Sequence, residues 1–284
     1  MIKFVKENFR YLVVGFLFAC VIFVWYAVFY ESRNGLAVYF LDVGQGDSIF
    51  IQAENGNQIL IDGGQNKSVL NQLSKVMPFY DRVIDVVIET HPDGDHIGGL
   101  VEVLNRYDVG LVMESGVKSD SAIYKELKNI IGRKNITEIL GKKGMRMNVG
   151  EGLFLDILFP VSDASEMESN SASIVARLVY ENTSFLLTGD SPQAIEKYLA
   201  SVYKDNLDVD VLKVGHHGSK TSSSEIFIGY TSPEYAIVSV GADNRYGHPS
   251  QEVLDILKKL EVKVLRTDEM GTIKIKSDGE NLSI

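Results

Sequence analysis

The chain has 284 residues and a formal net charge of −10, and 45% of its residues are hydrophobic. This length and composition support a real hydrophobic core, in one large domain or two modest ones. The single cysteine, Cys20, excludes intramolecular disulfides and a zinc site built from thiolates. Without the four basic and two acidic residues of positions 1–35, 24 basic and 36 acidic residues remain, a net charge of −12 that argues against indiscriminate binding to nucleic acid.

The N-terminal segment Tyr11–Tyr30 contains twenty residues without a charge. A helix of this length spans roughly 30 Å, the thickness of the hydrocarbon core of a bilayer. Lys3, Lys6 and Arg10 precede it, so the positive-inside rule predicts a single-pass protein of the cell membrane with a cytoplasmic N-terminus. A cleaved signal peptide is disfavoured because the segment is long and no small-residue cleavage site follows it. We therefore expect residues 1–35 to comprise the cytoplasmic N-terminus, a transmembrane anchor and a short linker.

The next part of the chain alternates short strands and helices. Apolar patterning and turn signals predict the strands Ala37–Val43, Ser48–Ala53 and Gln58–Ile61 (the last two joined by a hairpin at residues 55–57), the helix Ser68–Met77 and the strand Val83–Ile88. A second run of similar pattern predicts the strands Leu153–Phe159, Ser173–Tyr180, Ser184–Thr188, Val209–Val214, Tyr235–Val240, Val262–Leu265 and Thr272–Ile275, with helices Ala194–Val202 and Gln251–Leu260. Two β-rich halves of this kind indicate two sheets packed face to face with helices outside.

Histidines and aspartates crowd the segment that follows the strand Val83–Ile88. The six residues His91–His96 read His-Pro-Asp-Gly-Asp-His, which predicts a tight loop whose side chains converge on one point. Gly98 and Gly99 are then expected to open a helix over Leu100–Leu104. All five histidines lie in turns rich in glycine or aspartate, namely His91, His96, His216, His217 and His248. This distribution favours a metal site.

Seven motifs in order make the chain similar to a known family. They are Leu41–Ser48, Leu60–Gly64, Thr90–Gly99, Asn170–Ser173, Phe185–Asp190, Leu212–Ser219 and Tyr246–Pro249. The chain resembles the metallo-β-lactamase superfamily, and specifically the hydrolase domain of the ComEC competence (DNA-uptake) proteins. The resemblance covers essentially everything from Leu36 to the end, so residues 36–284 are expected to form the hydrolase domain.

The resemblance implies an α/β (α+β) fold, a four-layer αββα sandwich, with two divalent metal ions. Carried over by position, His91 and Asp93 would bind one metal; Asp95, His96 and His216 would bind the other; and Asp190 would bridge the two. Residues that alternate at the end of a strand can face two adjacent ions, and a carboxylate has two oxygens with which to span them.

Two departures from the common pattern of the superfamily affect the choice of metal. Asp93 stands where the superfamily usually has a histidine, and no histidine lies between His96 and His216. A turn that contains Asn170 and Ser173 takes that place and is expected next to the ligands. The first metal position is therefore oxygen-rich, so we expect Mn²⁺ or Zn²⁺, with Mg²⁺ also compatible.

Three further residues have expected roles beside the metals. Either His216 or His217 can be the liganding histidine, and His216 is assigned because it directly follows Gly215 and the preceding strand. His248 is the predicted general acid or phosphate contact, and His217 and Asp95 complete the predicted catalytic set. Asp62 is expected to accept the free N–H of a liganding histidine.

Three classes of function are compatible with these residues. The first is a membrane-anchored phosphodiesterase or nuclease that cleaves DNA outside the cytoplasmic membrane, alongside a separate DNA-channel protein. The second is a hydrolase of an envelope or small-molecule phosphodiester of the choline-phosphate or teichoic-acid type. The third is a non-catalytic metal-binding domain. A basic segment from Lys118 to Arg146 is either a solvated face or a flank that guides a polyanion toward the metals.

Overall fold

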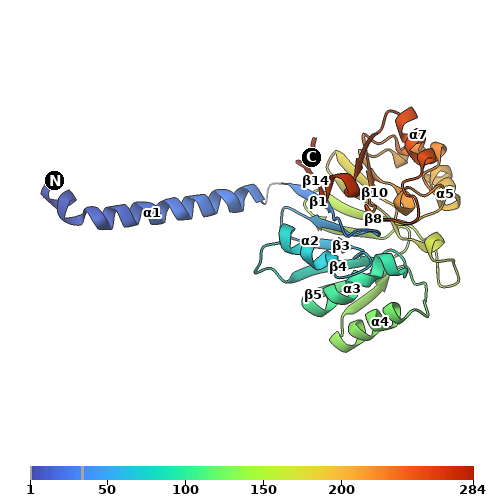
Figure 1. The fold of residues 1–284 in the computed structure, drawn as a ribbon, viewed down its shortest axis with the longest axis horizontal. Helices are drawn as coiled ribbons and strands as arrows, with labels where there is room; N and C mark the ends of the chain where they lie inside the picture. Colours follow the sequence, from blue (N-terminus) through green and yellow to red (C-terminus); the bar gives the residue numbers. More distant parts are fainter. Residues whose placement is uncertain (1, 33–34) are drawn as a thin grey trace.

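The computed structural model describes residues 2–32 and 35–284, with side chains described over 9–26 and from residue 35 on. Helix α1 (Ile2–Ser32) extends away from the rest of the chain in Figure 1. Its window Phe9–Tyr26 has a mean hydropathy of 2.0 and is 0% buried, so this helix is long and apolar enough to cross a membrane. The expected anchor lies within α1, and the expected linker is described only in part.

Among the described residues, fifteen strands form two mixed sheets. The first sheet has the order β15-β14-β1-β2-β3-β4-β5-β6, and the second has the order β13-β12-β11-β10-β9-β8-β7. The strands of the first sheet are β1 Leu36–Phe40, β2 Ile49–Gln52, β3 Gln58–Ile61, β4 Val83–Glu89, β5 Asp108–Glu114, β6 Thr137–Leu140, β14 Ile273–Ser277 and β15 Leu282–Ser283. Those of the second are β7 Arg146–Gly150, β8 Leu153–Phe159, β9 Val175–Tyr180, β10 Thr183–Leu187, β11 Val211–Lys213, β12 Tyr235–Val238 and β13 Lys263–Arg266.

Helices cover the outer face of each sheet (Figure 1). The α-helices after α1 are α2 Ser68–Val76, α3 Gly94–Arg106, α4 Ala122–Lys134, α5 Gln193–Tyr203, α6 Glu225–Thr231, α7 Gln251–Lys259 and α8 Thr267–Met270. The 3₁₀ turns are η1 Asn170–Ala172, η2 Lys204–Leu207 and η3 Gly215–Gly218. Helices α2, α3 and α4 share an apolar core with the first sheet, and α5, α6 and α7 share one with the second.

A third apolar core lies between the sheets. Alternate residues of facing strands, such as Val38 and Phe40 on β1 and Leu155 and Ile157 on β8, are buried there. A strand with one face toward this core and the other toward helices reads as a nearly continuous apolar run, as β2 and β3 do. The expected αββα sandwich is therefore confirmed.

The division into two consecutive β-rich halves was wrong at the C-terminus. Strand β14 joins the first sheet and pairs antiparallel with β1, with Val38 opposite Ile275 and Phe40 opposite Ile273. Both isoleucines are buried in the core between the sheets. This long-range pairing covers the edge of β1, which local sequence patterns do not report.

The predicted loop at residues 91–96 was also partly wrong, because α3 begins at Gly94 rather than after Gly98. Asp93 is extended and precedes the first turn, and its carbonyl accepts the N–H groups of His96 and Ile97. Gly99 lies inside the helix, where a Cβ would come within 2.0 Å of the carbonyl oxygen of Gly63. Gly98 and Gly99 therefore permit close packing of α3 against the chain after β3.

Candidate metal centre

His91 lies just beyond the carboxyl end of β4 and is completely buried. Its Nδ1 is 3.0 Å from Thr90 Oγ1 and 3.3 Å from Ser173 Oγ, whereas its Nε2 has no protein hydrogen-bond partner. Asp93 Oδ2 is 3.8 Å from that Nε2. The two side chains therefore present a free imidazole nitrogen and a carboxylate oxygen to the same space.

The carboxylate of Asp93 is held by a hydrogen bond from a distant segment of the chain. Its Oδ1 accepts a hydrogen bond of 2.6 Å from Ser169 Oγ, just before η1. Asn170 follows, and its buried Oδ1 has no hydrogen-bond partner. Ser173 contacts His91 and also accepts the backbone N–H of Asp190 at 3.3 Å. The turn at residues 170–173 thus lies against the ligands, where the sequence expected it.

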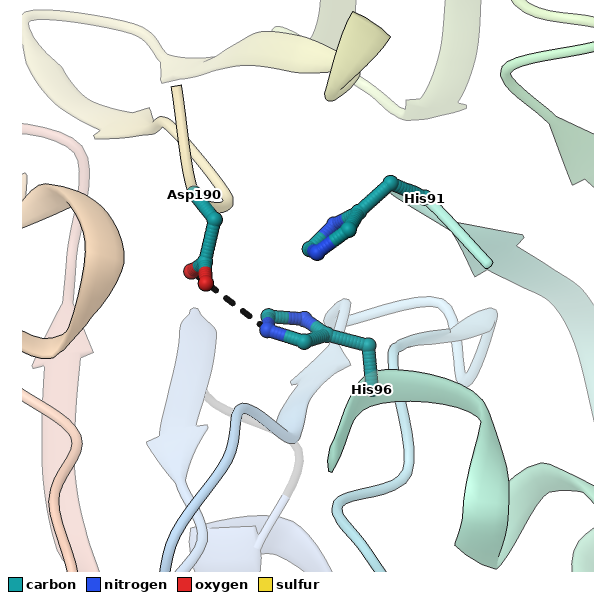
Figure 2. A group of neighbouring side chains, drawn as sticks. All are labelled: His91, His96 and Asp190. Atoms are coloured by element: carbon teal, nitrogen blue, oxygen red, sulfur yellow. Dashed lines mark ion pairs between the residues drawn. The ribbon is translucent and has the colours of Figure 1, made fainter. Parts of the chain in front are cut away.

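His96 projects from the first turn of α3 into the centre of the cluster (Figure 2). Its Nδ1 is 2.7 Å from Asp62 Oδ2, and its Nε2 is 3.4 Å from Asp190 Oδ1. Asp62 also accepts the N–H and the hydroxyl of Thr90, at 2.9 and 2.6 Å. Because Asp62 is itself fixed in this way, it orients the imidazole of His96 so that Nε2 points inward.

Asp190 follows β10 and lies between the histidines. Its Oδ1 faces His96, and its Oδ2 is 3.5 Å from His217 Nε2 and 3.7 Å from His216 Nε2. Asp95 Oδ2 is also 3.5 Å from His217 Nε2. One carboxylate thus faces ligand atoms on two sides, which is the geometry required of a bridging group.

The two adjacent histidines of η3 have different surroundings. His217 is 1% exposed, and its Nδ1 is 2.9 Å from the carbonyl oxygen of Ser239, which leaves Nε2 free to face the carboxylates. The side chain of His216 is 28% exposed, and its Nδ1 contacts Thr221 Oγ1 at 3.1 Å. The geometry therefore favours His217, rather than the His216 expected from sequence, as the metal ligand.

His248 lies at the rim of the cluster. Its ring centroid is 5.9 Å from that of His216, and it is stacked with the Tyr246 ring at an interplanar angle of 13°. Its Nδ1 has no hydrogen-bond partner among the described residues. Partial burial and the nearby His216 and His217 lower the pKa of His248. The unpaired Nδ1 is buried, whereas the imidazole ring as a whole is partly exposed at the rim of the cluster.

Sequence reasoning missed the buried cation Lys213. Its Nζ forms an ion pair with Asp47, is 3.2 Å from the carbonyl oxygen of Gly189, and lies 3.9 Å from Asp190 Oδ1. Asp47 Oδ1 is in turn 3.3 Å from His217 Nδ1. The available signal was a lysine inside the apolar run Val209–Val214. Such a residue is rarely buried without a partner.

The charges of the cluster shift the pKa values of its members. Burial, aided by the charge of His96, lowers the pKa of His91 to about 4. Burial also disfavours the charged form of His217, but Asp190 and Asp47 outweigh it and raise its pKa to about 9. The same competition raises the pKa of His96 and lowers that of Asp190. Metal binding must displace these protons, so it is linked to proton release.

The donor atoms fit metal ions. The Nε2 atoms of His91, His96 and His217 are buried and have no hydrogen-bond partner in the described part of the chain, and the same holds for Asp190 Oδ1. Ligand atoms of His91, His96 and Asp190 lie within 4.8 Å of one another, as do those of Asp95, His96 and His217. Figure 2 shows the first of these groups pointing toward a common centre. The two groups are adjacent, and Asp190, with Oδ1 facing His96 and Oδ2 facing His217, lies where a carboxylate can span two divalent ions.

An open hollow of about 600 Å³ adjoins the cluster at Asp95. Side chains that can donate or accept hydrogen bonds surround it, among them Gln45, Gln65 and Arg245. Tyr246, which is 71% exposed, also lines it. The cluster is therefore accessible from solvent on this side.

The basic segment between Lys118 and Arg146 does not form one uniform basic face. Lys128 pairs with Glu114 at 2.9 Å and also with Glu138, and Arg146 pairs with Asp156. These contacts favour the interpretation as a solvated, paired surface.

Comparison with protein families identifies the fold. Residues 41–242 match the model of the metallo-beta-lactamase superfamily. The chain belongs to this superfamily. Its members are generally metal-dependent hydrolases, and the fold binds dinuclear metal ions. The predicted family is confirmed.

Curated relatives of the chain are competence proteins, as the ComEC-like motifs predicted. ComE operon protein 3 of Bacillus subtilis is 34% identical over 281 residues, which cover 93% of this chain and 36% of the relative. Competence protein ComA of Neisseria gonorrhoeae is 31% identical over 256 residues, 89% of this chain and 34% of the relative. The chain thus spans about a third of the length of these relatives.

A solved structure of another protein is similar to this chain in its fold. CmlA, a diiron beta-hydroxylase from Streptomyces venezuelae, has a TM-score of 0.56 and 15% sequence identity over 86% of this chain and 54% of its own. This likeness concerns the fold, and the reaction must be argued from the residues of the site.

Proposed function

We propose that this chain is a membrane-anchored, dinuclear-metal phosphodiesterase that cleaves DNA outside the cytoplasmic membrane. The observation that carries the proposal is the set of buried donor atoms of His91, His96 and His217 around Asp190, beside a polar hollow of about 600 Å³ at Asp95. Phosphodiester cleavage needs positive charge beside two phosphate oxygens and room for a chain on either side of the phosphate. The competence-protein relatives support DNA as the substrate and DNA uptake as the context.

The ligand roles follow from the free donor atoms. His91 and Asp93 would hold one metal, Asp95, His96 and His217 the other, and Asp190 would lie between them. When bound, two divalent metals supply a hydroxide nucleophile and neutralise charge on the phosphate. The carboxylates of this set suit Mn²⁺ or Mg²⁺ and its three imidazoles suit Zn²⁺, and we propose Mn²⁺ or Zn²⁺ as the metals, with Mg²⁺ also compatible.

Other residues of the chain position these ligands or handle protons. Asp62 holds His96 by its Nδ1, which keeps Nε2 free for a metal. Lys213 balances the buried charge of Asp47 and Asp190. His248 lies beside His216 at the rim of the cluster, with ring centroids 5.9 Å apart, where its imidazole would contact the phosphate or its leaving oxygen.

The location of the domain is part of the proposal. Helix α1 would cross the membrane, and the basic residues Lys3, Lys6 and Arg10 would keep the N-terminus in the cytoplasm. Residues 36–284 would then form the hydrolase domain outside, alongside a separate DNA-channel protein. An envelope phosphodiester of the choline-phosphate or teichoic-acid type is the second candidate substrate. A choline-phosphate diester is zwitterionic, so the acidic domain does not repel it as it repels a long polyanion.

A metal-reconstitution assay tests the proposal. The metal-free protein is supplied with Mn²⁺, Zn²⁺ or Mg²⁺ and assayed on single- and double-stranded DNA and on bis-p-nitrophenyl phosphate. We expect metal-dependent cleavage of DNA that Asp190→Asn abolishes and that the surface control Asp205→Asn retains. Cleavage of the small diester with DNA left intact would favour the second substrate class. No turnover of either substrate with any of the metals would contradict an enzymatic role.

The same assay distinguishes the two histidines of η3. His217→Ala is expected to lower metal affinity strongly, because Nε2 of His217 is buried and aimed at Asp95 and Asp190. His216→Ala should retain most of the affinity. The opposite order would restore His216 as the ligand.

A further inference from the structure

An aromatic and basic surface lies beside the point where the chain enters the folded domain from α1. Phe79 and Tyr80 occupy the turn between α2 and β4, and they are 86% and 65% exposed. Their rings contact each other edge to face, with centroids 5.4 Å apart. Two adjacent aromatic rings left in water are costly, so an exposed pair of this kind indicates a contact surface.

Three lysines lie around this turn. A hollow of about 290 Å³ is lined by Lys75, at the end of α2, and by Lys274 and Lys276, on the outer face of β14. Pro78, which directly precedes the aromatic pair, and Gly35, the first described residue after α1, line the same hollow. A group of three lysines is notable in a domain whose net charge is −12, with 24 basic and 36 acidic residues remaining after position 35.

The acidic residue of the turn is directed inward. Asp81 accepts a hydrogen bond of 2.7 Å from Gln58 Nε2, and its other oxygen accepts the N–H of Val83 at 3.2 Å. The exposed side chains of the turn itself, Phe79, Tyr80 and Arg82, are therefore aromatic or basic. That combination matches the headgroup region of a bilayer, where aromatic rings enter the interface and lysines approach anionic lipids.

We propose that Phe79, Tyr80, Lys75, Lys274 and Lys276 form the surface by which the hydrolase domain rests on anionic lipid headgroups of the membrane crossed by α1. The inference rests on the proposed anchoring by α1. Only residues 33 and 34 separate Ser32 from Gly35, so these residues can be at most about 11 Å apart. In Figure 1 the turn between α2 and β4 lies on the side of the domain from which α1 leaves.

This docking would determine which way the metal centre faces. Strand β4 runs from Val83, next to the aromatic turn, to Glu89, two residues before His91. A strand of seven residues is about 20 Å long. The metal centre would thus be held at the end of β4 that points away from the lipid, open to a substrate in the aqueous phase.

Fluorescence quenching in the full-length chain tests the proposal. The protein is placed in nanodiscs of mixed phosphatidylglycerol and phosphatidylcholine that carry a spin-labelled lipid, and an environment-sensitive dye is attached to single cysteines. The native Cys20 reports on α1. Phe79→Cys in a Cys20→Ala background reports on the proposed surface, and Ile226→Cys, at a 60% exposed position of α6, is the matched control.

We expect quenching at positions 20 and 79 and none at position 226. Quenching at 20 without quenching at 79 would overturn the docking surface and leave the anchor intact. No quenching at 20 would overturn the anchor and, with it, the docking. Retained activity of each labelled variant on bis-p-nitrophenyl phosphate shows that it is folded.

Charge reversal tests the role of the lysines. A lysine near an anionic membrane surface contributes about a factor of five to the binding equilibrium. The variant Lys274→Glu/Lys276→Glu should therefore lower the equilibrium constant for docking by at least about 25-fold and weaken quenching at position 79. Lys197→Glu/Lys258→Glu, at exposed positions of α5 and α7, should leave the quenching unchanged. Equal quenching in both variants, or in nanodiscs of phosphatidylcholine alone, would contradict electrostatic docking.

Discussion

Replacement of Lys213 by methionine tests whether this lysine compensates the negative charge of Asp47 and Asp190 in the candidate metal centre. Lys213 is 0% exposed, and its ammonium group is surrounded by Asp47, Asp190 and the carbonyl oxygen of Gly189. Methionine fills a similar volume but leaves the two carboxylates without this cation. Removing one partner of a buried ion pair costs about 3–5 kcal/mol. We expect about 3 kcal/mol in the metal-free protein, because charged His96 and His217 offset part of the loss.

The assay is urea unfolding of the metal-free fragment 36–284. Unfolding is monitored by far-ultraviolet circular dichroism, because the only tryptophan, Trp25, lies in α1 and the fragment therefore has no tryptophan fluorescence. With an m-value of about 3 kcal/mol per M, a loss of about 3 kcal/mol lowers the urea midpoint by about 1 M. The surface control Lys258→Met should change stability by less than about 0.5 kcal/mol.

Two further measurements separate charge compensation from packing. Adding Asp47→Asn to Lys213→Met should recover part of the loss, because it removes an uncompensated carboxylate. Addition of Mn²⁺ should stabilise the Lys213→Met variant more than the wild-type protein, because the metal and the ammonium group compete for Asp190. A loss below about 1 kcal/mol in the metal-free variant, or no coupling to Asp47, would refute the reasoning.

Three other predictions follow from the structure. Gly99→Ala should destabilise the fold by about 3 kcal/mol because its Cβ would meet a backbone oxygen at 2.0 Å, whereas Gly132→Ala in α4 meets nothing within 4 Å and should be neutral or stabilising in urea unfolding. Truncation before Leu36 should yield a soluble domain with intact metal binding, because each buried core residue among those described lies at or beyond Leu36; sedimentation of the fragment with membranes would argue against this. Asp62→Ala should weaken metal binding about 10–100-fold in a metal titration, because His96 loses its orienting partner; unchanged affinity would exclude that role.

Local patterns in the sequence were sufficient to predict the family, the two-sheet sandwich and most strands. Motifs such as Thr90–Gly99 and Phe185–Asp190 place ligand residues directly after strands, and the carboxyl ends of neighbouring strands meet at one edge of a sheet. The long uncharged segment near the N-terminus likewise predicts an apolar helix from composition alone. These features depend on spacing along the chain, which is visible without a structure.

The tertiary structure decided features that depend on contacts between distant residues. The pairing of β14 with β1 joins segments more than 200 residues apart, and no local signal reports it. His216 and His217 are adjacent in the chain, yet only His217 is fully buried with Nε2 close to both Asp95 and Asp190, because Ser239 holds its Nδ1 from another strand end. The ion pair between Lys213 and Asp47 likewise joins residues that are distant in the chain. Burial and charge compensation are properties of the folded environment, so they become visible only when the sheets are assembled.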